Sequence, residues 1–306
     1  MQANGKKTAH WIRRENHWEL YVMLIPGVVL AFIFCYMPIY GVQLAFREYN
    51  FVGNYLGGEW VGMKYFMQFF KDPYFPRLLR NTLVLNLWSL VFGFPLPIIF
   101  ALLLNELSSS KLKKTAQISS FLPYFISNVV VVGIVMRLFA SNGFVNTVLE
   151  SIGIKRKLFF TDPRYFRGLF VGSDIWQGLG YTAVIYISAL TTIQQELYEA
   201  ATLDGANRFQ KTVYITIPGI APTIIVMLIL EIGRMMNVGA EKVLLMYNPA
   251  IYETADVIST YVYRRGLIDF DYSFSTAVGL FNSVCNFVLL IIANITSRAL
   301  TDHGLW

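Results

Sequence analysis

The stretch Glu199–Ala206 reads Glu-Ala-Ala-Thr-Leu-Asp-Gly-Ala, and residues 207–218 continue it as Asn-Arg-Phe-Gln-Lys-Thr-Val-Tyr-Ile-Thr-Ile-Pro. This polar segment lies between two long apolar runs, so we expect a loop at a membrane surface. The residues before Asp204 are strong helix formers, and Gly205 can adopt the left-handed conformation that ends a helix. The residues after the turn can form a second helix, which Pro218 then interrupts. The sequence thus predicts a helix, a turn and a second helix, with small residues at the turn that let another surface approach closely.

The composition indicates an integral membrane protein. Of the 306 residues, 55% are hydrophobic and 14% are charged, whereas soluble domains contain about a quarter charged residues. A membrane-spanning helix needs about 20 apolar residues. Uncharged stretches of that size predict six spans, at residues 20–46, 82–104, 115–136, 175–195, 212–230 and 272–297. The fifth span is broken near its start by Pro218 and Pro222, which a bundle tolerates where neighbouring helices satisfy the freed backbone groups. The predicted fold class is therefore an all-α integral membrane protein with six transmembrane helices.

The first apolar run follows a basic leader, residues 1–19, and the predicted transmembrane domain covers residues 20–306. A signal peptide would have a shorter apolar core and a small-residue cleavage site. The run at 20–46 is too long, and its end has no Ala-x-Ala pattern. We therefore expect a retained membrane anchor.

An even number of spans places both termini on the same side as the hairpin at Glu199. The short loop 105–114, with three lysines, also lies on this side. The positive-inside rule then assigns this side to the cytosol, because basic residues in short loops set the orientation. The basic clusters at 155–157 and 264–265 fall on the opposite side, but in longer loops, where charge counts for less.

The first external segment, about residues 47–81, is rich in aromatic side chains. They are Tyr49, Phe51, Tyr55, Trp60, Tyr65, Phe66, Phe69, Phe70, Tyr74 and Phe75. Aromatic residues near Gly and Pro can form a belt at the membrane interface or a surface that docks another protein. The sequence is compatible with both interpretations.

Nothing in the sequence predicts catalysis, a metal site or a resident cofactor. The chain has two cysteines, Cys35 and Cys285, both inside predicted spans, and its three histidines lie near the termini. It has no Gly-x-x-x-x-Gly-Lys phosphate loop. The net charge of +6 is spread over many loops, which fits membrane-adjacent cations better than a nucleic-acid-binding patch. We expect a non-enzymatic chain that contacts membrane lipid and no nucleic acid.

The loop from about 196 to 218 resembles the EAA loop of permease subunits in bacterial ATP-binding-cassette importers. The matching elements are Glu-Ala-Ala, a Gly four residues after the second Ala, and Ile-x-Ile-Pro at the end. The resemblance assigns the ATPase-coupling role to Glu199, Ala200, Ala201, Asp204, Gly205 and Pro218. Of these, it implies that Glu199 and Gly205 contact the ATPase. Thr202 and Asn207 are interpreted as solvated.

Within that family, the chain resembles the maltose-permease-like group, and in it the permeases for oligosaccharides released from polysaccharides. The stretches that carry this weaker likeness are Ile25-Pro26-Gly27, the segment 36–42 and Arg80-Asn81-Thr82-Leu83. The resemblance implies the type I importer fold in the bacterial cytoplasmic (inner) membrane. It also implies a second homologous permease, two ATPase subunits that bind ATP and magnesium, an extracytoplasmic solute-binding protein and a sugar substrate. Alternating access would follow ATP-driven motion of the hairpins.

Polar residues inside spans are candidates for the substrate pathway. They are Trp176, Gln177, Tyr181, Glu231, Asn237 and Asn282. Tyr181 follows Gln177 by four residues, so both lie on one helix face, and an aromatic ring with an amide suits a sugar. The alternative for each amide is a hydrogen bond between helices, worth about 0.6 kcal/mol. Glu231 and Arg234 are three apart and could pair with each other.

Other functional classes are compatible with parts of this pattern. An importer permease for amino acids or peptides would share the loop, and its binding protein would distinguish it. A self-contained secondary transporter also uses proline-broken helices, but it leaves the Glu-Ala-Ala loop unexplained. A membrane scaffold or sensor that moves nothing is a third class. The sequence does not specify the sugar or whether this subunit or its partner holds it.

Overall fold

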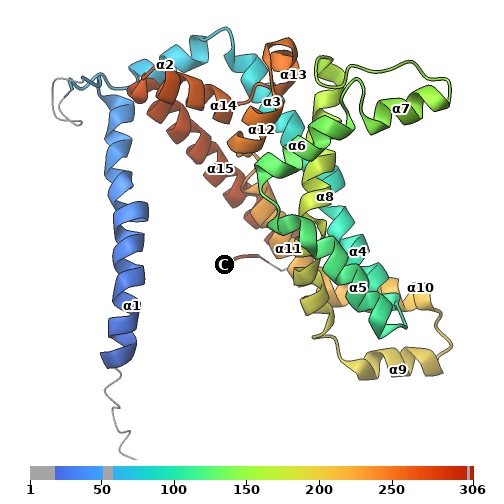
Figure 1. The fold of residues 1–306 in the computed structure, drawn as a ribbon. Coiled ribbons are helices and arrows are strands. Elements are labelled where there is room, and N and C mark those ends of the chain that lie inside the picture. Colours follow the sequence, from blue (N-terminus) through green and yellow to red (C-terminus); the bar gives the residue numbers. More distant parts are fainter. Residues whose placement is uncertain (1–17, 51–57, 302–303) are drawn as a thin grey trace, which may run out of the picture. The chain divides into compact units, whose positions relative to one another are not determined.

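The computed structural model describes residues 18–50, 58–301 and 304–306. Within these ranges the regular structure is helical, apart from an isolated antiparallel bridge between Arg47 and Trp60. The predicted all-α fold is therefore confirmed for this part of the chain (Figure 1). The basic leader lies almost entirely outside the described residues. The chain divides into two compact units, residues 1–43 and 44–306, which are described separately.

The first unit is dominated by one apolar helix. Helix α1 (Trp18–Ala31) contains Pro26 and continues through a wide π-type turn, η1 (Phe32–Tyr36), into a 3-10 segment, η2 (Met37–Phe46), which runs into the second unit. The continuous helical stretch Leu20–Phe46 is long and apolar enough to cross a membrane. It matches the predicted first span.

The second unit contains the remaining helices. In chain order they are α2 (Lys64–Lys71), α3 (Phe75–Trp88), η3 (Ser89–Gly93), α4 (Pro95–Glu106), α5 (Ser110–Phe121), η4 (Leu122–Phe125), α6 (Asn128–Leu138), α7 (Phe144–Ser151), α8 (Pro163–Leu190), α9 (Gln195–Leu203), α10 (Arg208–Lys211), η5 (Thr212–Thr216), α11 (Ile217–Ile232), α12 (Ala240–Met246), η6 (Pro249–Ile251), α13 (Tyr252–Ala255), α14 (Ile258–Tyr263), η7 (Arg264–Ile268) and α15 (Tyr272–Thr301).

Four helical stretches among the described residues are long and apolar enough to span a membrane, or up to five if one bent pair counts as a span. They are Leu20–Phe46, Phe75–Glu106, Arg208–Ile232 and Tyr272–Thr301. The predicted span at 175–195 overlaps α8 over residues 175–190, and residues 191–194 fall in the turn before α9. The middle of α8 holds Asp174 and Gln177. These two polar residues make α8 less apolar than the other four stretches.

The predicted span at 115–136 is not a straight helix. It corresponds to Ser110–Phe125 followed by Asn128–Leu138, and the two parts meet at 102°. Pro123 lies in the last turn before the bend, and Ile126 and Ser127 are extended. A proline removes a backbone donor, and the extended residues end the helix. Residue patterns that predict a span thus do not reveal its break.

The expected interruption at Pro218 is wrong. The helix runs from Arg208 to Ile232, and Pro218 lies in the first turn of α11, directly after the wide turn η5. In that turn the N–H of Ile217 bonds to the carbonyl of Thr212, five residues back. The five-residue turn just before Pro218 locally changes the hydrogen-bond pattern, and such wide turns inside helices accommodate a residue without an N–H. Pro222 is likewise enclosed within α11.

Helices α4, α8 and α11 share a buried core that includes Ala101, Ala183, Tyr186 and Ile220. Helix α8 begins at Pro163, where the side chain of Asp162 accepts from the N–H of Arg164 and caps the helix. In Figure 1, α9 and α10 lie at one end of α8, and α7 and α13 lie at the other. The second unit therefore has two distinct ends, joined by α8.

Helix α5 crosses α8 at Gly180, where the two backbones nearly touch. A Cβ atom built on Gly180 would lie 2.3 Å from the carbonyl carbon and oxygen of Ser120. Small residues allow such close helix packing in membrane proteins. Because the obstacle is backbone, a larger residue at Gly180 would force the two helices apart.

Candidate functional site

The predicted turn at the end of α9 is present. Gly205 has φ +78°, in the left-handed region, and a Cβ atom built there would meet nothing within 4 Å. The N–H of Ala206 bonds to the carbonyl of Ala201 at 2.9 Å, and that of Gly205 bonds to the carbonyl of Thr202 at 3.1 Å. Glycine is thus needed here for its backbone conformation, since the surrounding space is open.

The second arm of the hairpin starts with a capping box. The side chain of Asn207 accepts from the N–H of Gln210 at 2.9 Å, and the Gln210 side chain accepts from the N–H of Asn207 at 2.8 Å. Such caps satisfy backbone donors that a helix start leaves free. Asn207 is exposed, as expected for a solvated residue, and it also caps the second arm of the hairpin.

Side chains also brace the two arms against each other. The ammonium of Lys211 donates to the hydroxyl of Thr202 at 2.7 Å. Near the base of the hairpin, the hydroxyls of Tyr198 and Thr216 lie 2.9 Å apart. Thr202 is exposed, yet it joins α9 to α10. The hairpin is therefore a braced unit rather than a pair of independent helices.

The tip of the hairpin exposes both polar and apolar groups. Glu199, Ala200 and Asp204 are exposed. Leu203 is 90% exposed and Phe209 is 77% exposed, and neither was singled out from the sequence. Large apolar side chains this exposed beside a turn are typical of contact surfaces. A polar loop that places Leu and Phe on either side of Asp-Gly is the signal that could have identified them.

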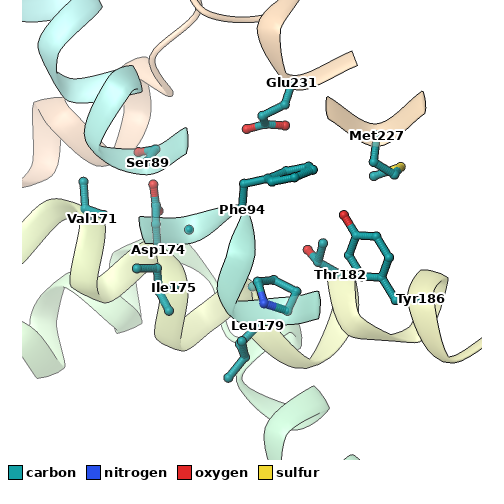
Figure 2. Close-up of a pocket in the computed structure, with 13 residues that line it drawn as sticks. Ser89, Phe94, Val171, Asp174, Ile175, Leu179, Thr182, Tyr186, Met227 and Glu231 are labelled. Atoms are coloured by element: carbon teal, nitrogen blue, oxygen red, sulfur yellow. The ribbon is translucent and has the colours of Figure 1, made fainter. Parts of the chain in front are cut away.

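A second candidate site lies between the helices, about midway along α8. Residues of η3, α4, α8 and α11, with Phe94 between η3 and α4, line a pocket of about 180 Å³. Figure 2 shows its lining: Ser89, Gly93, Phe94, Pro97, Val171, Asp174, Ile175, Gly178, Leu179, Thr182, Tyr186, Met227 and Glu231. The buried hydroxyl of Tyr186 has no hydrogen-bond partner within the described chain. The pocket thus combines an aromatic ring with unengaged polar groups, which suits a polyhydroxylated ligand.

Glu231 is the one predicted pathway residue that lines this pocket. Glu231 and Arg234 share a backbone hydrogen bond, from the N–H of Arg234 to the carbonyl of Glu231. Their side chains form no ion pair in the described structure. The predicted alternative, in which the two charges pair, is therefore wrong for this structure.

Gln177 is engaged in a polar network instead. Its side-chain N–H groups donate to the carbonyl of Ile126 at 3.0 Å and to Asn128 at 3.3 Å. Its oxygen accepts from Lys242, at 3.3 Å, and Lys242 also donates to Asp174 at 2.5 Å. Ile126 belongs to the extended break before α6, so Gln177 satisfies a carbonyl that the bend has freed. Lys242 is only 4% exposed, so its charge depends on Asp174.

The remaining predicted pathway residues lie apart from the pocket. Tyr181 stacks on Tyr124 with ring centroids 3.8 Å apart. Trp176 lines an apolar hollow between α6 and α8. Asn282 on α15 donates to Asn237, in the loop between α11 and α12, at 2.8 Å. The structure therefore distributes the six candidates over several places, and Asp174, Thr182 and Tyr186 line the pocket with Glu231.

The part of the chain that the structure describes contains no group of three or more His, Cys, Asp or Glu side chains that could hold a metal ion. The two candidate sites are thus an exposed hairpin tip and a small polar pocket.

Comparison with known proteins gives consistent matches over most of the chain. The family described as binding-protein-dependent transport system inner membrane component matches residues 20–302. Protein LplB of Bacillus subtilis (strain 168) is 42% identical over 294 residues, which cover 96% of this chain and 92% of LplB. The polygalacturonan/rhamnogalacturonan transport system permease protein YteP of the same organism is 38% identical over 288 residues, covering 94% of this chain and 90% of YteP.

A solved structure is also similar in sequence and fold. It is the crystal structure of a bacterial alginate ABC transporter in complex with an alginate pentasaccharide-bound periplasmic protein. One of its chains aligns with a TM-score of 0.86 and 42% identity, covering 94% of this chain and 96% of that chain.

Proposed function

Because the chain belongs to the family of inner membrane components of binding-protein-dependent transport systems, we propose that it is a permease subunit of an ATP-binding-cassette importer for oligosaccharides. With a second permease it would form the pathway, and a solute-binding protein would deliver the sugar. The family match over residues 20–302 carries this proposal. The braced hairpin at Gly205 supports it, because a permease without an ATPase domain needs a surface that receives ATP-driven motion.

In this proposal the hairpin docks into an ATPase subunit. Leu203 and Phe209 would supply the apolar contacts, and Glu199 would meet a cation of the ATPase. The isolated chain would not hydrolyse ATP, and the ATPase subunits would bind ATP and magnesium.

In this proposal the pocket lined by Glu231 and Tyr186 is a transient sugar-binding site on the transport pathway. Its acceptors and donors can bond sugar hydroxyls, and the ring of Phe94 offers an apolar face. The elements η3, α4, α8 and α11 would separate or close around it as the permease alternates between inward-open and outward-open states.

The proposal includes six membrane crossings. The bent pair α5–α6 would be the third crossing and α8 the fourth. Both termini and Glu199 would face the cytosol, and Trp60 and Lys155 would face outward. Single cysteines labelled with an impermeant reagent, in a background without Cys35 and Cys285, test this orientation. Labelling at position 199 from outside intact cells would overturn it.

An oligosaccharide substrate is supported by the names of the relatives. YteP is named for polygalacturonan and rhamnogalacturonan, a third relative of Bacillus subtilis is named for arabinooligosaccharides, and the solved transporter is described with an alginate pentasaccharide. These three names all refer to saccharides, so we favour a sugar over an amino acid or a peptide as the substrate.

Reconstitution of the complete importer in liposomes tests the proposal. Uptake of labelled oligosaccharide should require ATP inside, both permeases, the ATPase subunits and the loaded binding protein. A secondary transporter would instead give uptake without the ATPase subunits, and a scaffold would give none with any component. Either result would replace the proposed function.

A further inference from the structure

A group of arginines gathers at the end of α8 that lies away from the hairpin. Arg77 and Arg80 lie on α3, Arg167 on α8, and Arg264 at the start of η7. The short helix α13 packs against both α3 and α8 at this end (Figure 1). Positive charge from three separate elements thus converges on one region.

Two of these arginines are neutralised by one buried carboxylate. Asp256 has a fully buried side chain and accepts from Arg264 at 2.8 and 2.7 Å and from Arg77 at 3.5 Å. Thr260 donates a further hydrogen bond to Asp256 at 2.8 Å. A buried, fully bonded carboxylate of this kind is an internal structural pair.

The other two arginines converge on Asn81 and the backbone of Glu253. Arg167 donates to the side-chain oxygen of Asn81 at 3.3 Å, and Asn81 donates to the carbonyl of Glu253 at 2.9 Å. Arg80 reaches the same carbonyl at 3.5 Å. Asn81 also donates to the carbonyl of Asp256 at 3.0 Å and is fully buried, so it fixes this region firmly.

Arg80 and Arg167 have no ion-pair partner within 4.0 Å in the described part of the chain. The Nε atom of Arg167 is buried and makes no hydrogen bond. Arg167 lies on α8 before the predicted span at 175–195. Burial and the nearby charge of Arg80 lower the pKa of Arg167, and the exposed carboxylate of Glu253 only partly opposes this lowering. Two guanidinium groups therefore lie close together without the anion that would offset their repulsion and desolvation.

Guanidinium groups bind carboxylates through two parallel hydrogen bonds, which is why arginine is favoured for recognising that group. We propose that Arg80 and Arg167 bind a carboxylate of an acidic oligosaccharide as the binding protein releases it. This inference rests on the proposed function, and it places the pair at the outer mouth of the pathway. The substrate class would then be oligosaccharides that contain uronic acids.

A sugar carboxylate suits this position better than an acidic side chain of the binding protein. Arg80 is exposed but Arg167 is half-buried beside the buried Asn81. A small ligand can reach both groups, and its hydroxyls can bond the carbonyl of Glu253. A uronic acid chain carries a carboxylate on every unit, so successive units could use the pair in turn.

The first experiment measures what the cognate binding protein binds, by calorimetry with short oligogalacturonates, oligoalginates and their uncharged methyl esters. Binding of acidic sugars is expected. Binding of neutral sugars alone would overturn the inference and leave the proposed importer intact. Absence of ATP-dependent uptake of any sugar would instead reject the proposed function.

The second experiment measures uptake of the acidic sugar by the reconstituted importer with Arg80→Gln, Arg167→Gln and the double variant. We expect uptake of the acidic sugar to fall about tenfold or more in the double variant, as for a lost charge pair. Arg80→Lys should retain more uptake than Arg80→Gln. Arg156→Gln is the matched control, because Arg156 is an exposed arginine that pairs with Glu150. Its uptake should stay at the wild-type level.

ATP hydrolysis stimulated by the loaded binding protein distinguishes the two sources of carboxylate. If the arginines dock the binding protein, the variants will weaken its affinity for the permease whichever sugar it carries, and the inference is wrong. Undiminished acidic-sugar uptake in the double variant would refute it as well. The expected result is normal docking with slower uptake.

Discussion

Replacing Gly205 with valine should uncouple the ATPase, and replacing it with asparagine should not. Gly205 has φ +78°. A left-handed conformation costs an ordinary L-residue about 1–2 kcal/mol, and strain of about 1–3 kcal/mol is typical of such positions. Asparagine adopts this conformation more readily than other non-glycine residues. Because a Cβ at this position meets nothing within 4 Å, neither side chain is excluded within the hairpin itself.

The two variants therefore differ mainly in backbone energy. A difference of about 1–2 kcal/mol changes the ratio of the formed turn to alternative conformations by about 5–30-fold. Gly205→Val should lower both the ATPase retained on purification and the stimulation of hydrolysis by the loaded binding protein. Gly205→Asn should keep both near the wild-type level. Uptake, hydrolysis and subunit recovery are measured on the same preparations.

Gly153 provides a matched control. It has φ +80° and open space around its Cβ position, but it follows α7 at the opposite end of α8. Gly153→Val introduces the same backbone strain without touching the hairpin, so ATPase association should be unchanged. Equal loss of coupling in Gly205→Val and Gly205→Asn would show that bulk at the tip matters and backbone conformation does not. Normal coupling in both would remove the turn from the mechanism.

Two further predictions concern the supporting structure. Asn207→Ala removes the capping box at a cost of about 0.5–2 kcal/mol, so coupling should fall moderately, whereas Asn207→Ser should retain it; equal activities would mean that the cap is dispensable. Asp174→Asn leaves the buried Lys242 without its counter-charge and should lower the melting temperature of the purified complex. Breaking such a pair typically costs about 3–5 kcal/mol of folding stability, and we expect the low end of this range because Asp174 is partly exposed. The double variant with Lys242→Met should recover stability, and a double variant less stable than Asp174→Asn would contradict the pairing.

The hairpin could be predicted from the sequence because its determinants are local. The left-handed residue is the glycine of Asp-Gly, and the helix formers before it are contiguous. The spans at 20–46 and 272–297 could also be predicted from the sequence, since an uncharged apolar run of that length has few structures open to it other than a membrane-spanning helix. The sequence predicts the second helix but not its cap at Asn207. An asparagine can be solvated or can cap a helix, and the residue type alone does not distinguish the two roles.

The polar network could not be predicted in the same way. Gln177 looks like a ligand-binding residue in one helix, but its partners Ile126 and Lys242 are distant in sequence. Asn81 bonds residues about 170 positions away. Such partners become visible only when the helices are assembled. A polar residue in a span therefore indicates that a partner exists, while the fold decides whether that partner is a ligand or another helix.

The first arm of the hairpin joins a pocket wall through the turn at residues 191–194, and the second arm joins one through an unbroken helix. These connections give the proposed coupling its physical route. Helix α8 ends at Leu190, four residues before the N-cap of α9, and it carries Asp174, Thr182 and Tyr186 to the pocket. The second arm runs without interruption through Pro218 into α11, which carries Met227 and Glu231.

Helix α8 contains 28 residues, so at 1.5 Å per residue it is about 42 Å long and reaches from the hairpin to the arginines at its other end. If α8 moves largely as a rigid element, the proposed displacement of the hairpin would reach both the pocket and the arginines at the other end of α8. In the proposed coupling, an ATPase that pulled on residues 199–209 would act on the α8 and α11 walls of the pocket at once. In this proposal the unbroken helix through Pro218 matters, because a break there would disconnect α11 from the hairpin and leave only α8 to follow it.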